Sequence, residues 1–475
     1  MSDLNDKLVS GLKWGSVEKF STYGVQFLLS IVMARLLTPA DFGVVGMITI
    51  FLALSTIFID SGFAVALIRK KDATDTDFSS VFYFNILLSL LFYGVLYLAA
   101  PAIASFYDTP ILCRVTRILG LTVIISSLTI VQRARVTKEI RFNIHAKVTF
   151  TSAAISGTAG IAAAYAGFGP WAIVLQLMLA SALTSALYWY FSSWRPSKLF
   201  SLRTIREMFS FSSKLLVATL LLVIYNNIYQ LVIGKWFSMA QVGFFSKANS
   251  YANLPNDAIG RTINNVALPA LARIGDNDAE LLGYYRRLLR GTSCVLFPIM
   301  GAIVALAVPG VRLVLTEKWM PAAPLLQILA TACVMAPIRM INQNVYHIKG
   351  RSDIYLKTEV INKLLITALL AATIPLGIQA ICWGFLAVSY VQFFVNAHYN
   401  SRLVGYHLRR QLGDIGRPLL VTLVMTAAIF GLTLLIRHDL AAILAGGVVM
   451  LATSAWMLNR EVRIRTLYAK FFHKA

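Results

Sequence analysis

Long apolar runs separated by short polar loops make up most of the chain. A helix of roughly 20 apolar residues crosses a hydrocarbon core about 30 Å thick. The sequence holds fourteen such runs, and they cover residues 13–36, 43–68, 78–100, 113–132, 146–166, 170–191, 211–234, 241–272, 288–308, 324–346, 354–376, 378–400, 417–436 and 440–458. The pattern predicts an all-α polytopic membrane protein with about 14 transmembrane helices.

The eighth run, 241–272, is the least apolar, because a polar residue recurs at every fourth position. These residues are Asn249, Asn253, Asp257, Arg261 and Asn265. Steps of four drift by only about 40° each on an α-helix, so the five side chains form one winding stripe. Such a helix either lies outside the bilayer or lines a wet cavity within it, and Pro255 predicts a kink.

The composition agrees with a membrane protein and excludes several other classes. Hydrophobic residues make up 58% of the 475 residues and charged residues 13%, whereas soluble chains have roughly 45–50% and 25%. The four cysteines and six histidines are scattered, with no spacing typical of a metal site. We therefore expect no metal, no cofactor and no disulfide framework.

The net charge of +22 is explained by its distribution among the loops. Counted loop by loop, 31 Lys and Arg residues fall on one side of the predicted membrane and 7 on the other. Positively charged loops stay in the cytoplasm. The split predicts that both termini are cytoplasmic, and it accounts for the basic composition without nucleic acid.

Nine charged residues remain inside the predicted spans. The cations are Lys19, Lys247, Arg261, Arg339 and Lys363, and the acids are Glu18, Asp60, Asp257 and Glu359. Each costs about 3 kcal/mol at mid-bilayer, so such residues usually face a wet cavity or a charged partner. Snorkelling to the interface is the alternative, and it suits Glu18 and Lys19 near a helix end.

Two pairs of these charges, Asp257 with Arg261 and Glu359 with Lys363, have i,i+4 spacing. That spacing places opposite charges on adjacent turns, either as a structural ion pair or as a pair that opens for substrate or a proton. Asp60 is a third candidate for such coupling. Amide side chains in these spans suit sugar hydroxyls, although amides also join helices; they are Asn226, Asn227, Gln230, Asn249, Asn253, Asn342 and Gln343. A basic cavity open to the cytoplasm would attract an anionic headgroup such as a phosphate.

An internal repeat relates the two halves of the chain. ARLLTPADFGVV (34–45) aligns with GKWFSMAQVGFF (234–245) at an offset of 200, and the loop after Pro101 matches that after Pro309 at an offset of 208. Six spans per copy predict two parallel lobes, related by an axis along the membrane normal. We expect lobes at 1–191 and 211–402, a cytoplasmic amphipathic linker at 192–210, and two extra helices with a basic tail at 403–475.

The segment ARLLTPADFG (34–43), together with DSGFAVALIRK (60–70) and GFFSKANSYANLP (243–255), resembles the polysaccharide-transporter family. These are Wzx-type, colanic-acid-exporter-like flippases of the multidrug/oligosaccharidyl-lipid/polysaccharide exporter superfamily. The resemblance implies two six-helix lobes around a central cavity, and alternating access in the bacterial inner membrane. The implied substrate is an undecaprenyl-diphosphate-linked oligosaccharide, moved from the cytoplasmic to the periplasmic leaflet for lipopolysaccharide or exopolysaccharide biosynthesis.

Two other functions stay open. A cation-coupled drug or metabolite antiporter of the same superfamily would favour an acidic cavity, whereas the spans hold five cations and four acids. A membrane polysaccharide polymerase would need a catalytic exterior face, and the exterior loops 101–112 and 309–323 are poor in acids and arginines. We therefore expect a transporter and not an enzyme. Its partners would be the lipid-linked oligosaccharide, membrane lipids, and the polymerase and glycosyltransferases of the pathway.

Overall fold

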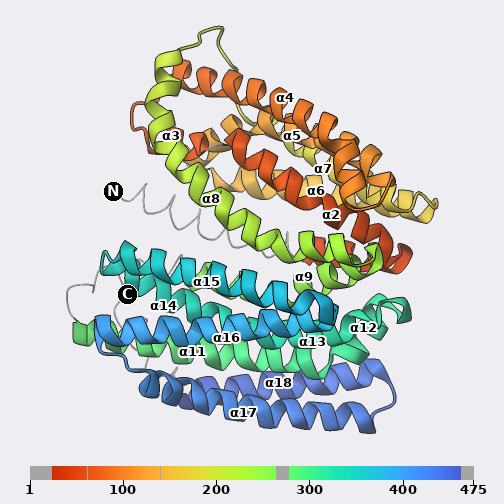
Figure 1. Cartoon of the computed structure of the whole chain (residues 1–475), viewed down its shortest axis with the longest axis vertical. Coiled ribbons are helices and arrows are strands. Elements are labelled where there is room, and N and C mark those ends of the chain that lie inside the picture. Colours follow the sequence, from red (N-terminus) through yellow and green to blue (C-terminus); the bar gives the residue numbers. More distant parts are fainter. Residues whose placement is uncertain (1–23, 61, 140, 264–277, 462–475) are drawn as a thin grey trace. The chain divides into compact units, whose positions relative to one another are not determined.

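The computed structural model describes residues 24–60, 62–139, 141–263 and 278–461, and every regular element in these ranges is a helix (Figure 1). They form two compact units, residues 1–243 and 244–475. This division groups α8 with the helices before it, whereas the expected lobe boundaries are at 191 and 211. Those boundaries stay a prediction. Glu18, Lys19 and Asn265 lie outside the described residues.

The described part of the first unit contains a helix over Gly24–Leu36 and seven helices after it. These are α2 (Pro39–Asp60), α3 (Phe63–Arg69), α4 (Asp75–Phe106), α5 (Ile111–Lys138), α6 (Phe142–Tyr165), α7 (Pro170–Phe191) and α8 (Leu202–Trp236). The next helix, α9 (Met239–Thr262), begins in the first unit and continues into the second.

The second unit continues with long helices and two short 3-10 helices. They are α11 (Asp278–Ala305), α12 (Ala307–Leu315), η2 (Glu317–Trp319), α13 (Ala322–Cys333), α14 (Ala336–Ile348), α15 (Ser352–Thr373), η3 (Ile374–Leu376), α16 (Ile378–Val404), α17 (Leu408–Leu435) and α18 (Asp439–Glu461).

Each of the fourteen predicted spans overlaps one described helix or two consecutive ones, although residues 13–23 of the first span and 264–272 of the eighth lie outside the described residues. Within the described ranges, ten segments are long and apolar enough to cross a membrane. Four predicted spans are not among these ten: the Gly24–Leu36 helix is shorter, α9 is long but polar, and α6 and α8 are the other two. Apolar side chains cover outer faces, as on α4, where Leu87, Leu91 and Leu98 are each more than half exposed. Two predicted spans are not single helices and need correction. The span at 43–68 is divided between α2 and α3, and the span at 324–346 between α13 and α14.

The two turns matched at an offset of 200 have the same hydrogen bonds. Thr38 donates from its amide and hydroxyl to Oδ2 of Asp41, at 2.8 and 2.7 Å, and the Asp41 amide donates back to the Thr38 hydroxyl at 3.3 Å. Ser238 and Gln241 repeat the pattern at 3.1, 3.3 and 3.3 Å. Both are capping boxes that satisfy free amides at a helix start. The structure confirms this local correspondence.

Glycines at equivalent positions let these two turns touch within the first unit. A Cβ added to Gly43 would lie 1.9 Å from the Met239 carbonyl oxygen, and one added to Gly243 would lie 1.9 Å from the Pro39 carbonyl oxygen. Met239 follows Pro39 by the same 200 residues, so the contact is reciprocal. Only a residue without a side chain allows a backbone approach this close.

The correspondence at an offset of 208 is also visible in the backbone. Among the described residues, Asp108 and Thr316 are the non-glycine residues with positive φ, at 51° and 86°, and they lie 208 residues apart. Gly169 and Gly377, again 208 apart, both have positive φ and immediately precede α7 and α16. Left-handed backbone is rare outside glycine. These shared turns support two parallel copies of one helical repeat.

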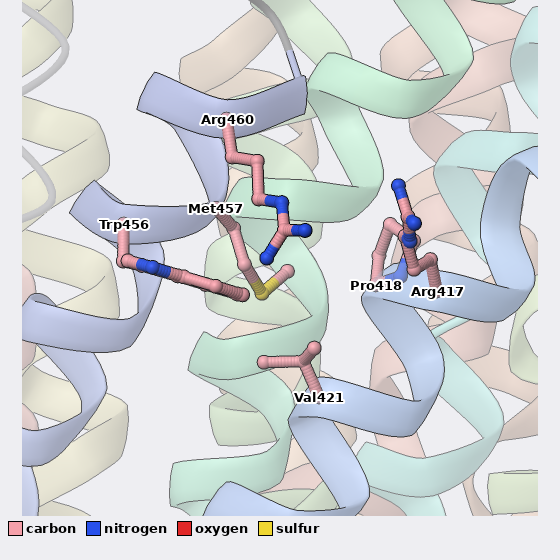
Figure 2. A pocket seen from close by; sticks show the side chains of 6 residues that line it. All are labelled: Arg417, Pro418, Val421, Trp456, Met457 and Arg460. Carbon is pink, nitrogen blue, oxygen red and sulfur yellow. The ribbon is translucent and has the colours of Figure 1, made fainter.

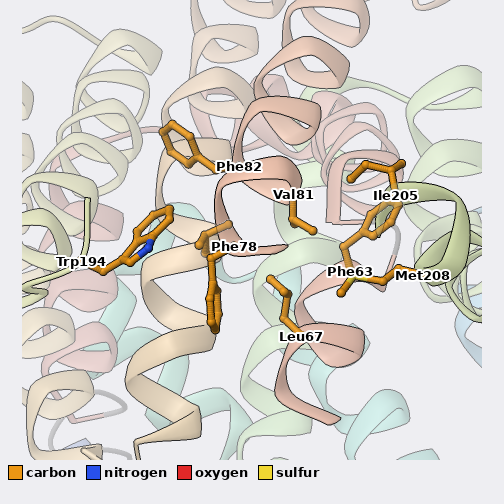
Figure 3. Close-up of a cluster of buried hydrophobic side chains, with 9 residues drawn as sticks. Phe63, Leu67, Phe78, Val81, Phe82, Trp194, Ile205 and Met208 are labelled. Atoms are coloured by element: carbon orange, nitrogen blue, oxygen red, sulfur yellow. The ribbon is translucent and has the colours of Figure 1, made fainter. Parts of the chain in front are cut away.

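The segment predicted as a linker is attached to the start of α4. The amide of Ser197 donates to the Ser79 hydroxyl at 2.9 Å, and the Thr204 hydroxyl donates to Oδ1 of Asp77 at 3.0 Å. Trp194, Ile205 and Met208 are buried in an apolar cluster with side chains of α3, α4 and α5 (Figure 3). Among the other apolar side chains of this segment, Leu199, Leu202 and Phe209 are exposed.

The charge distribution predicts the orientation of α7 in the membrane. Ala166 precedes this helix, Ser193 follows it, and both residues are exposed. Residues 192–214 include five Lys or Arg residues and residues 166–169 include none. In a background lacking the four native cysteines, Ser193→Cys should react with an impermeant maleimide only after the inner membrane is permeabilised. Ala166→Cys should react in intact spheroplasts. The reversed pattern would contradict the assigned topology.

The reciprocal glycine contact predicts a loss of stability when either glycine gains a side chain. Gly43→Ala or Gly243→Ala would press a methyl group against a backbone carbonyl, and overpacking of this kind costs about 1–3 kcal/mol. Thermal unfolding in detergent should show a lower midpoint for both variants. Gly94→Ala is the control, because no atom lies within 4 Å of its added Cβ. Equal midpoints for all three variants would show that the contact is not tight.

Candidate functional site

The break between α13 and α14 is the starting point of the site. Pro337 has no amide hydrogen, so the carbonyl of Cys333, four residues earlier, loses its helical partner. Nδ2 of Asn256, from α9, donates to this carbonyl oxygen at 3.1 Å. Inside a membrane, a freed backbone group needs such a partner from the protein. The break is therefore held by a side chain of a neighbouring helix.

Two members of the predicted polar stripe on α9 reach the same place. Nδ2 of Asn253 donates to the backbone oxygen and to Oδ1 of Asn249, both at 2.9 Å. The Cys333 thiol donates to Oδ1 of Asn253 at 3.5 Å. Asp257 is exposed, and the Arg261 side chain lies outside the described part of the chain. The predicted pairing of Asp257 with Arg261 stays a prediction.

One turn beyond the break, α14 presents Arg339 and then Gln343 to the helices that follow. Nη1 of Arg339 donates to Oε1 of Gln392, a buried residue of α16. Nε2 of Gln343 donates to Oε1 of Glu359, on α15, at 2.9 Å. Nζ of Lys363 lies 3.4 Å from Oε2 of Glu359, which confirms the ion pair predicted from their spacing. We call Arg339, Gln343, Glu359, Lys363 and Gln392 the α14–α16 cluster.

The α14–α16 cluster contains two cations and one carboxylate. Glu359 is paired with Lys363 and also attracts the Arg339 guanidinium electrostatically. The Glu359 and Lys363 side chains retain 24% and 23% exposure, so a ligand can reach them. A guanidinium, an ammonium and an amide together match the oxygens of a phosphate. The arrangement can hold an anion that takes the place of the carboxylate.

The remaining predicted residues lie elsewhere. Lys247 is buried in α9, with its ammonium 6.0 Å from the centre of the Tyr251 ring. In the first unit, Asn226 of α8 is exposed, and Nδ2 of Asn227 donates to the Val223 carbonyl at 2.9 Å. Gln230 is half-buried beside Gly46 of α2. Asp60, at the end of α2, accepts the Ala64 amide at 3.4 Å. Lys19 is not among the described residues.

Asn342 belongs to a second, fully enclosed network at the ends of α11, α14, α16 and α17. Its Oδ1 accepts the Tyr285 hydroxyl, its backbone oxygen accepts Nδ2 of Asn400 at 3.2 Å, and its Nδ2 lies 3.4 Å from Oε1 of Gln411. All four residues are fully buried. Buried amides with this many partners fix helices to one another.

Asp414 extends this network with a carboxylate held from three directions. Arg286 binds it through two nitrogens, at 2.7 and 3.0 Å, and Nε of Arg290 donates to Oδ1 at 2.9 Å. The hydroxyl of Tyr406, in the loop before α17, donates to Oδ2 at 2.6 Å. Burial, and then this hydrogen bond, raises the pKa of Tyr406, so the hydroxyl stays protonated and donates. The group is a structural joint at a helix end.

Three contributors to the site were not selected from the sequence. Asn256 lies just outside the every-fourth-residue stripe, Gln392 is a single amide in an apolar run, and Cys333 has no metal-like spacing. The available signal was Pro337, since a proline within a predicted span frees the carbonyl four residues earlier. That carbonyl requires a donor, and Asn256 is in the least apolar of the predicted spans, 241–272.

The chain is similar to a known protein family. The family model for polysaccharide biosynthesis proteins matches residues 32–324. The chain belongs to this family. The match includes ARLLTPADFG (34–43), which resembles the polysaccharide-transporter family. That resemblance is confirmed.

Two relatives are similar to this chain over nearly their whole length. The teichuronic acid biosynthesis protein TuaB of Bacillus subtilis (strain 168) is 26% identical over 441 residues, 92% of this chain and 91% of TuaB. The lipopolysaccharide biosynthesis protein WzxC of Escherichia coli (strain K12) is 24% identical over 448 residues, 92% and 90% of the two chains. Among solved structures, the lipid II flippase MurJ in an inward closed conformation has the same fold, with a TM-score of 0.75, 15% identity and coverage of 94% and 98%.

Proposed function

We propose that this protein is a flippase of the bacterial inner membrane. It moves an undecaprenyl-diphosphate-linked oligosaccharide from the cytoplasmic to the periplasmic leaflet by alternating access, for surface polysaccharide biosynthesis. The observation that carries the proposal is the family match, together with full-length similarity to proteins named for teichuronic acid and lipopolysaccharide synthesis. The shared fold with a lipid II flippase supports a lipid-linked substrate.

The α14–α16 cluster supplies the chemistry that this substrate requires. A diphosphate has to leave the water at the membrane surface, and charged donors within membrane-spanning helices replace its hydration. Arg339 and Lys363 provide those donors, and Gln343 and the amides of α9 suit sugar hydroxyls next to the phosphates. Glu359 pairs with Lys363 in the empty carrier and gives up this contact when the diphosphate binds.

The alternatives have less support. A drug or metabolite antiporter of the same superfamily would share the fold, but the full-length relatives reported above are named for polysaccharide biosynthesis. No catalytic step is proposed for the chain, and we regard it as a transporter. We further propose that the polymerase and glycosyltransferases of the pathway are its partners and that both of its termini are cytoplasmic.

Loss of the cluster cations should abolish transport without unfolding the protein. Arg339→Ala and Lys363→Ala should each slow flipping of an undecaprenyl-diphosphate-linked oligosaccharide in proteoliposomes at least about tenfold, because each removes a desolvated charge contact. Arg339→Lys keeps the charge but loses the planar fork, so partial activity is expected. Arg402→Ala, an exposed cation at the end of α16, is the control and should leave the rate unchanged. Wild-type flipping by the Arg339→Ala/Lys363→Ala double variant would overturn the assignment.

Loss of the cluster carboxylate should affect turnover more than binding. Glu359→Gln keeps the side-chain size but leaves Lys363 without its counter-ion in the empty carrier, so the return step should slow. Repeated flipping in vesicles should fall and lose its response to a pH gradient, while single-site substrate binding stays near wild type. Asp257→Asn should behave in the same way, and Glu280→Gln, an exposed acid at the start of α11, is the control. If Glu359→Gln turns over normally, the ion pair is only structural.

A further inference from the structure

Two arginines near the start of α5 carry charges that no acid of the described chain neutralises. Arg114 is exposed, Arg117 is half-buried, and neither forms an ion pair with a described residue. The nearest acid in the sequence, Asp108, pairs with Lys235 instead, at 3.5 Å. Residues three apart are neighbours on the surface of a helix. This end of α5 therefore presents two adjacent positive charges without a counter-ion.

The guanidinium of Arg117 is held in place but has no hydrogen-bond acceptor. Its carbon lies 4.4 Å from the centre of the Tyr97 ring, on α4. Stacking on an aromatic ring orients a guanidinium and leaves its edges available for hydrogen bonds. The Nε–H is fully buried, and no described acceptor reaches it. Burial thus removes water from this donor without replacing it, which favours an anion at the terminal nitrogens of the half-buried side chain.

The length of α5 places the two arginines at the level of lipid headgroups. The helix has 28 residues, and Arg114 and Arg117 follow its first residue, Ile111, by three and six. It is therefore about 42 Å long, with the two arginines about 4.5 and 9 Å from its start. A helix of this length centred on a hydrocarbon core of about 30 Å extends about 6 Å beyond it at each end. The pair thus lies across the boundary where lipid phosphates meet the hydrocarbon.

The surface around the arginines is apolar and faces lipid chains. Leu98 of α4 is 80% exposed, and Ile118 of α5 is 39% exposed. Tyr93 packs closely between the two helices, since a Cβ added to Gly120 would lie 3.1 Å from its ring. A lipid bound here would place its hydrocarbon chain against α4 and α5 and its charged group beside the arginines. A free anion would gain only the second of these contacts.

A pocket of about 210 Å³ between α17 and α18 also contains two arginines, but their environment differs. The lining residues are Arg417, Pro418, Val421, Trp456, Met457 and Arg460 (Figure 2). Arg417 already interacts with another group of the protein. The pocket therefore does not offer two free cations, whereas the surface of α5 does.

We propose that Arg114 and Arg117 bind the phosphate group of a membrane lipid at the start of α5. Guanidinium groups match phosphate oxygens through parallel hydrogen bonds. The leaflet is periplasmic in the proposed topology, in which the loop 101–112 is exterior. Two kinds of lipid present this chemistry: an anionic glycerophospholipid, such as phosphatidylglycerol, and a polyprenyl diphosphate. The α14–α16 cluster belongs to the second unit, so the two sites can be tested independently.

Binding can be measured by native mass spectrometry of the delipidated full-length protein in neutral detergent. Phosphatidylglycerol and undecaprenyl diphosphate are titrated separately. Arg114→Gln/Arg117→Gln should weaken binding of one or both at least about tenfold, and the lipid with the larger loss is the ligand. Arg203→Gln/Arg206→Gln is the matched control, with the same spacing and charge change, because Arg203 already pairs with Glu207 at 2.8 Å. The control should bind like wild type, and diacylglycerol, which has no phosphate, should bind weakly to all three proteins.

A second measurement locates the lipid. Tyr97→Leu should weaken binding because it removes the ring on which Arg117 stacks, whereas Tyr97→Phe keeps the ring and should retain the affinity. In a background lacking the four native cysteines, a fluorophore attached to Ile118→Cys should be quenched by the spin-labelled lipid. Adding Arg114→Gln/Arg117→Gln should remove most of that quenching.

Three results would overturn the proposal. The first is equal affinity of the wild type and the Arg114→Gln/Arg117→Gln variant for both lipids. The second is an equal loss of affinity in the Arg203→Gln/Arg206→Gln control, since any pair of surface cations would then suffice. The third is competition by inorganic phosphate at the same concentrations as the lipids, which would indicate a site for a free anion.

Discussion

A carbonyl that loses its amide partner inside hydrocarbon has to find another donor, and this requirement organises the second unit. Pro337 removes the donor for Cys333, and Asn256 replaces it from α9. Because the helix restarts at Ala336, the first turn of α14 brings Arg339 toward α16 and the next turn brings Gln343 toward α15. The contacts around this one missing amide hydrogen therefore involve five helices, α9, α13, α14, α15 and α16, and they set the place of the charges.

The same unit satisfies its buried acids in two different ways. Asp414 is enclosed by two arginines and a tyrosine, so each of its oxygens has more than one donor. Glu359 receives one amide hydrogen bond and one looser ammonium contact, and it remains partly exposed. A carboxylate with many ligands stays where it is, whereas one with few can exchange them. The fold thus places a fixed carboxylate on α17 and an exchangeable one on α15, two helices that both pack against α16.

Sequence reasoning recovered the helical architecture because apolar run length is set by membrane thickness and needs no tertiary information. It also located the repeat turns and the Glu359–Lys363 pair, since both depend on local spacing. It did not find the contacts that depend on how helices pack, such as Gln392 with Arg339 and the enclosure of Asn342 by Tyr285. The α13–α14 break was also missed, because hydropathy averages over a proline that changes a single hydrogen bond.

The reciprocal contact of Gly43 and Gly243 has a consequence for how the chain can change over time. Equivalent atoms meet equivalent atoms across the two turns, which is the relation found at the centre of a symmetric homodimer. A single chain that keeps such a contact is constrained at both glycines together. A larger residue in one copy of the turn would clash with the backbone carbonyl of the other copy, and no second substitution in the same copy would remove that clash. The sequences of the two halves can diverge elsewhere, but at these two contacting turns both have to keep a glycine.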